Sequence, residues 1–88
     1  MTPAIITNIR IDDYRIVFEL TDDREVSLPL TMTAGLAQAS DVERKRWVIQ
    51  SRGMAAHWPD IDEDIAIWEI LGIGEDVYLR SLQAEPVS

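Results

Sequence analysis

The sequence contains no cysteine, which excludes disulfide bonds, thiolate metal sites and cysteine nucleophiles. It also shows neither a basic leader nor any run approaching the ~20 apolar residues that would span a bilayer. We therefore expect a cytoplasmic protein that contacts no membrane.

Histidine is almost absent, since His57 is the only one in the chain. A metal site could use a single imidazole, and a catalytic triad could use only this base. The chain has no Gly-x-Ser-x-Gly elbow, and acids rather than a phosphate-binding helix start follow Gly72-Ile73-Gly74. We predict no catalytic residues and no cofactor. A small hydrolase or metal enzyme using His57 with Asp62 or Asp64 is the weakest alternative.

The pattern Asp60, Asp62, Asp64 has the one-three-five spacing of a calcium loop. An EF-hand places glycine at the sixth position and glutamate at the twelfth, whereas this chain has Ile65 and Leu71 there. The EF-hand is therefore excluded. An irregular Mg²⁺ or Ca²⁺ site using Asp62 and Asp64 stays open, but acids that solvate an exposed turn are the simpler interpretation.

Basic residues are scarce, with 8 Lys and Arg against 16 Asp and Glu and a net charge of −8. The chain up to Pro59 is close to neutral, whereas the part from Asp60 onward carries many acids against Arg80 alone. A partner chosen by electrostatics should therefore be basic, and direct binding to nucleic acid is disfavoured. The one basic run, Arg44-Lys45-Arg46, is expected to be a solvated face of a helix. If it acts at all, it should pair with acids of the same fold or of a second subunit.

The 88 residues are enough for one domain, and about half of them are apolar. Alternation predicts a strand over 5–11 with Ile5, Thr7, Ile9 and Ile11 on one face. A second strand over 14–20 should bury Tyr14, Ile16, Phe18 and Leu20. A third over 25–28 should end at Pro29, which cannot donate to a ladder. We thus predict a small antiparallel meander of about three strands near the N-terminus.

Short helices are predicted to cover this meander, which makes the expected fold class α+β. A brief helix is expected within 31–39, and Ser40 with Glu43 forms a capping box for a helix over 41–47. The residues 65–67 are extended in character, and a helical turn over 68–71 should stop at Gly72. A C-terminal helix over 75–83 should bury part of Val77, Leu79 and Leu82.

Three tryptophans, Trp47, Trp58 and Trp68, are many for a short chain. An indole can fill a core or anchor an interface. We expect at least one in the core, and another could be exposed beside the acidic segment.

The chain resembles a family of short bacterial proteins known as domain of unknown function twenty-four forty-two. The resemblance rests on a hairpin closing in Leu28-Pro29-Leu30, on Ala39-Ser40 with Glu43-Arg44, and above all on the segment His57-Trp58-Pro59-Asp60-Ile61-Asp62-Glu63-Asp64-Ile65. It covers residues 5–71 and leaves 72–88 as an extension within a single domain of residues 1–88. The usual hairpin turn of the family carries Asp-Gly, whereas this chain has Asp22-Asp23, which leaves the turn geometry open.

The resemblance implies a small α+β fold and either an antitoxin-type role beside a second small protein or a module fused to a DNA-binding helix-turn-helix. It implies no catalytic activity, and no helix-turn-helix can be recognised in this sequence. We predict a non-catalytic, antitoxin-like module that binds a basic protein. The alternative is an acidic phage-type inhibitor that imitates nucleic acid and blocks a DNA- or RNA-binding enzyme. A homodimer is also possible. The predicted partner-binding residues are His57, Trp58, Asp60, Asp62, Glu63, Asp64, Trp68 and Glu69.

Overall fold

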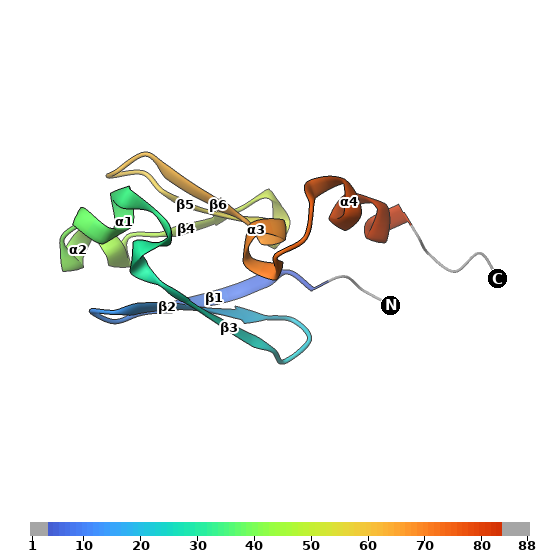
Figure 1. Cartoon of the computed structure of the whole chain (residues 1–88), viewed down its shortest axis with the longest axis horizontal. Helices are drawn as coiled ribbons and strands as arrows, with labels where there is room; N and C mark the ends of the chain where they lie inside the picture. Colours follow the sequence, from blue (N-terminus) through green and yellow to red (C-terminus); the bar gives the residue numbers. More distant parts are fainter. Residues whose placement is uncertain (1–3, 84–88) are drawn as a thin grey trace.

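The computed structural model describes residues 4–83 and contains two layers of β-sheet with short helices (Figure 1). Both sheets are three-stranded and antiparallel, with the strand orders β1-β2-β3 and β4-β5-β6. The strands are β1 (Ile6–Ile11), β2 (Arg15–Leu20), β3 (Glu25–Pro29), β4 (Val48–Gln50), β5 (Ala55–Trp58) and β6 (Glu63–Ala66). The predicted α+β class and N-terminal meander are confirmed, whereas the second sheet was not predicted.

The central strand β2 follows the predicted alternation, because Ile16, Phe18 and Leu20 are all buried. Tyr14 was expected on the same face but is 80% exposed. It lies in the turn before β2 begins, where the strand period does not apply. The prediction for Tyr14 is therefore wrong.

Strand β1 contains an irregularity that reverses part of its predicted face. Ile6 pairs with Leu20, but Asn8 pairs with Glu19, so Thr7 is an extra residue in the ladder. This bulge resets the alternation, and the buried residues of the strand are Ile6 and Ile9. The expectation that Thr7 faces the core with Ile9 is wrong for that reason.

The β2–β3 turn forms without the glycine that the family usually has there. Asp23 adopts a left-handed φ of 67°, which aspartate tolerates better than most residues. The Leu20 amide donates to the Arg24 carbonyl, and the Asp22 carboxylate accepts the Arg24 amide. Asp23 thus supplies the conformation that glycine would provide.

Three short helical segments connect the sheets: η1 (Leu30–Met32), α1 (Ala34–Gln38) and α2 (Asp41–Lys45). The capping box predicted for α2 is present, since Ser40 Oγ accepts the Glu43 amide and Glu43 accepts the Ser40 amide. The helix ends before the predicted residue 47, because the chain turns into β4 at Val48.

The hydrophobic core lies between the two sheets. It contains Ile9, Ile16 and Phe18 from the first sheet with Trp58 and Ile65 from the second, all in one buried cluster. A sheet with one apolar face needs such a cover. The second sheet, rather than the helices as predicted, therefore covers most of the apolar face of the first sheet.

The chain finishes with α3 (Ile67–Leu71) and α4 (Glu75–Gln83), which the sequence placed closely. Gly72 ends α3 with a left-handed φ of 73°. Among residues 75–81 of α4 the buried side chain is Tyr78, whose hydroxyl donates to the Ala4 carbonyl, while Val77 and Leu79 are 46% and 38% exposed.

Val77 and Leu79 are thus partly buried, whereas the burial of Tyr78 between them was not predicted. The Leu82 side chain lies outside the described part. Within residues 4–83, no helix is long and apolar enough to cross a bilayer.

Candidate functional site

The signature segment from His57 to Asp64 folds as the β5–β6 hairpin. Trp58 pairs with Glu63, and the Ile61 amide donates to the Trp58 carbonyl across a turn that starts with Pro59. Proline favours this place in a turn because its φ is already fixed. Asp62 takes a left-handed φ of 53°. Much of the signature is thus explained by the geometry of the hairpin.

Trp58 is fully buried, and its Nε1–H donates to the Arg44 carbonyl at 2.9 Å. We had assigned Trp58 to the partner-binding surface. That assignment is wrong, because an indole in the core cannot touch a partner. Trp58 instead fixes the hairpin against the end of α2.

His57 and Asp64 are direct cross-strand neighbours, with Nδ1 and Oδ1 2.5 Å apart. They share the outer face of the second sheet with Val48, which is opposite His57 on β4. In the described structure no hydroxyl is hydrogen-bonded to His57, and no group of three or more His, Asp and Glu side chains is placed to hold a metal ion. The contact between His57 and Asp64 therefore links strands β5 and β6.

The remaining acids of the hairpin differ in their surroundings. Asp60 lies 3.3 Å from the Arg46 guanidinium, and Glu63 is half-buried against α1, where a Cβ on Gly35 would lie 3.0 Å from its Oε2. Asp62 is exposed at the turn, and no ion pair to it occurs among residues 4–83. Asp62 is therefore the hairpin acid most available to a partner.

Trp68 and Glu69 do not join the other predicted residues. They belong to α3, and the half-buried Trp68 ring lies 6.0 Å from the Tyr78 ring. The tip of the β5–β6 hairpin is at the opposite end of the second sheet from α3 (Figure 1). The predicted set therefore divides between two places on the molecule.

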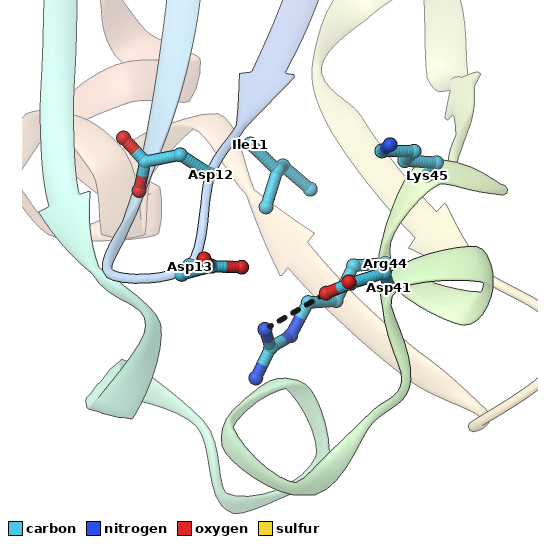
Figure 2. Close-up of a pocket in the computed structure, with 6 residues that line it drawn as sticks. All are labelled: Ile11, Asp12, Asp13, Asp41, Arg44 and Lys45. Carbon is cyan, nitrogen blue, oxygen red and sulfur yellow. Dashed lines mark ion pairs between the residues drawn. The ribbon is translucent and has the colours of Figure 1, made fainter.

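The sequence did not indicate a cavity of about 140 Å³ between the β1–β2 turn and α2 (Figure 2). Its lining residues are Ile11, Asp12, Asp13, Asp41, Arg44 and Lys45. These residues come from two segments far apart in the chain, and of their charged members only Arg44 and Lys45 stood out in the sequence, as part of the basic run. No signal in a single sequence places Asp12 and Asp13 beside α2.

Two residues of the basic run 44–46, Arg44 and Arg46, serve the fold itself rather than only forming a solvated face. The Arg44 guanidinium donates to the Leu36 and Ala37 carbonyls at the end of α1 and lies 3.7 Å from the Asp41 carboxylate. Arg46 pairs with Asp60. Lys45 is the one residue of this run for which the described structure shows no ion pair.

One end of the elongated molecule thus gathers acids from three separate segments, and we call it the acidic end (Figure 1). The cavity places the β1–β2 turn beside α2, and the Arg46–Asp60 pair places the hairpin tip there too. Hydrogen bonds from the Tyr14 and Arg15 amides lower the pKa of Asp12, which keeps its carboxylate ionised. The acids of the acidic end are Asp12, Asp13, Asp41, Glu43, Asp60 and Asp62.

These features define a class of small acidic α+β proteins with two facing three-stranded sheets. A family model described as "Protein of unknown function (DUF2442)" matches residues 6–75. The chain belongs to this family, as its signature segment indicated. The match ends where α4 begins, so most of that helix lies outside it.

Two solved structures are similar to this chain. A protein of unknown function from Rhodospirillum rubrum ATCC 11170 has a TM-score of 0.70 and 23% identity, covering 89% of this chain and 99% of that one. An uncharacterised protein from Chromobacterium violaceum has a TM-score of 0.65 and 18% identity, covering 96% of this chain and 79% of that one. At these identities the likeness shows the fold. No curated protein matches the chain.

Proposed function

We propose that this protein is a non-catalytic, antitoxin-like module of the cytoplasm that binds a small basic protein through its acidic end. The observation that carries the proposal is the gathering of acids from the β1–β2 turn, α2 and the β5–β6 hairpin at one end of the molecule. Complementary charge steers a basic partner toward such a surface and raises the association rate.

The ionisation and exposure of the individual acids support binding through the acidic end. Asp12 is held ionised by backbone amides, the Asp41 side chain is 73% exposed, and Asp62 stands at an exposed turn. Arg44 already donates to two backbone carbonyls, so its charge is directed into the fold. The exposed excess at this end is therefore negative.

Imitation of nucleic acid remains the second candidate, but the arrangement of acids favours it less. A phosphate-like track requires carboxylates at regular intervals along the molecule. Here Glu75 and Asp76 stand at the start of α4, away from the acidic end. On the outer face of the first sheet, Glu19 and Glu25 are both paired with Arg10.

The proposal is tested with tagged protein used to capture partners from its own cells at low and high salt. We expect a basic protein that is released as salt rises, because exposed charges are screened beyond about 10 Å at 0.1 M salt. The variant Asp13→Asn with Asp62→Asn should weaken capture, measured as the bound fraction of that protein.

A matched control removes two charges elsewhere, with Glu75→Gln and Asp76→Asn on α4. This control should leave capture unchanged if the acidic end forms the contact. A captured protein that is indifferent to salt and to both variants would contradict the electrostatic basis. If the captured protein still takes up DNA while it is bound, imitation of nucleic acid is wrong as well.

A further inference from the structure

The two most exposed large apolar side chains of the described residues both lie at the acidic end. Tyr14 is 80% exposed and follows Asp13 in the β1–β2 turn, and Val42 is 65% exposed and follows Asp41 in α2. Each is therefore the direct neighbour of a residue that lines the cavity. An exposed tyrosine beside charged groups is a typical anchor of a protein interface.

The cavity lies between the segments that carry these two side chains, and its lining is mixed. Ile11 is half-buried in it, and the Asp13 and Asp41 carboxylates point toward one another across it (Figure 2). Two like charges that face each other favour a cation between them. The Arg44 guanidinium lies 3.7 Å from the Asp41 carboxylate, and no ion pair to Asp13 occurs among residues 4–83.

We propose that this cavity receives an arginine or lysine side chain of the basic partner, while Tyr14 and Val42 contact apolar groups beside it. This inference rests on the proposed function and assigns its contact to the β1–β2 turn and α2 rather than to the hairpin. An arginine suits the site well, because its apolar stem can lie on Ile11 while its guanidinium meets the carboxylates.

A second copy of the chain is a poor occupant of this end. Two acidic ends brought together would oppose like charges, and the whole chain carries a net charge of −8. Lys45 also lines the cavity, and its ammonium group should repel an incoming cation. Removal of the Lys45 charge is therefore expected to strengthen binding, which gives the test an effect of opposite sign.

The test uses the whole protein labelled with ¹⁵N and a synthetic peptide of alternating arginine and leucine, followed by NMR titration. We expect the largest shifts at the amides of Asp13, Tyr14 and Val42. A peptide of alternating glutamate and leucine should cause none. An arginine and glycine peptide should bind more weakly, because it offers Tyr14 no apolar side chain.

Three variants locate the contact, with dissociation constants measured by the same titration. Tyr14→Ala should weaken binding about tenfold, as loss of an interface anchor does. Asp13→Asn should weaken it about threefold, and Lys45→Gln should tighten it by about the same factor. Asp76→Asn on α4, which removes one equal charge far from the cavity, is the matched control and should change nothing.

Three results would overturn the inference, and the first two also separate it from the proposed function. If binding depends on salt but is unchanged in Asp13→Asn and Tyr14→Ala, the contact lies elsewhere and the proposed function still stands. Failure of both basic peptides to bind at low salt would reject the preference for a basic partner itself. Self-association that Tyr14→Ala abolishes would identify a second copy as the occupant and contradict the inference.

Discussion

Gly53 is the glycine at which adding a single methyl group should destabilise the fold most. It has a φ of 92°, and a Cβ there would lie 2.9 Å from Ile5 Cβ and 3.0 Å from the Ile6 carbonyl oxygen. We expect Gly53→Ala to lower the free energy of unfolding by about 2–4 kcal/mol, because strain and overpacking add. Urea unfolding followed by tryptophan fluorescence measures this loss.

Gly72 provides the matched control for that substitution. It also has a left-handed φ, of 73°, but nothing lies within 4 Å of a Cβ built there. Gly72→Ala should therefore cost only the backbone strain, about 1–2 kcal/mol. Equal losses for the two variants would show that the close approach to β1 does not matter.

Asp12 should make the stability depend on pH. The amides of Tyr14 and Arg15 donate to its carboxylate and lower its pKa in the folded state. A group with a depressed folded pKa stabilises the protein above its unfolded pKa of about 3.9, and this contribution is lost as pH falls through the folded value. Asp12→Asn should thus be less stable than wild type at neutral pH, with a difference that shrinks toward about pH 3.

The measurement is urea unfolding of both proteins across this pH range. Asp13→Asn is the control, because the described structure shows no hydrogen bond to the Asp13 side chain. Its difference from wild type should vary less with pH. An Asp12→Asn difference that stays constant from neutral pH to pH ~3 would contradict the assigned cause.

At the scale of elements, the sequence predicted what depends on neighbours along the chain. The Ser40–Glu43 capping box and the limits of α4 are local signals, and both agree with the structure. The face of β1 was missed because one extra residue at Thr7 shifts the ladder, and no residue type marks that bulge.

The second sheet was missed for a different reason. Its strands are only 3 or 4 residues long, so alternation has too few repeats to show. Its existence depends on pairing between segments that are joined by turns with left-handed residues such as Arg52 and Asp62. The acidic end could be predicted only in part, because it is assembled from residues about 50 positions apart in the chain.

Within residues 4–83, strand β3 is an edge strand of the first sheet, and Arg15 covers part of its outer edge. The Leu30 amide donates to the Tyr14 carbonyl, which sets the ladder so that the Ser27 amide and carbonyl point away from β2. The Arg15 guanidinium covers this position by donating to Ser27 Oγ at 2.6 Å and to the Ser27 carbonyl at 3.3 Å. Pro29 has no amide proton to donate, so the last residue of β3 is also a poor hydrogen-bond partner for a strand of another molecule.

We therefore expect Arg15→Ala to associate through β3 more strongly than wild type, as a shift toward dimer in sedimentation velocity at rising concentration. Arg10→Ala is the matched control, since Arg10 is on the same sheet but binds the carboxylates of Glu19 and Glu25. An Arg15→Ala protein that associates no more than Arg10→Ala would contradict the protective role. Dimerisation of the wild-type protein itself stays a prediction.

At the scale of the whole molecule, the charge is distributed by the fold rather than by sequence position. The first two thirds of the chain are nearly neutral, yet Asp12, Asp13 and Asp41 meet Asp60 and Asp62 at one end. The acids of α4 lie apart from them. A surface that selects partners by charge is therefore a property of the tertiary structure, and the sequence alone placed it only in part.

This concentration of charge should also affect stability. Carboxylates at the acidic end repel one another, and the net charge of −8 means that repulsion outweighs attraction in the chain as a whole. Exposed ion pairs such as Arg24–Asp22 weaken in salt, but each contributes only about 0–1 kcal/mol. Raising the salt should therefore increase the free energy of unfolding by roughly 0.5–1 kcal/mol at neutral pH.

Urea unfolding at several sodium chloride concentrations measures this increase. The variant Asp13→Asn with Asp62→Asn should show a smaller salt dependence, because it relieves repulsion at the acidic end. Asparagine also accepts the left-handed backbone of position 62, so the fold should be retained. A wild-type protein that loses stability as salt rises would mean that its ion pairs outweigh the repulsion, and the acidic end would then carry little electrostatic strain.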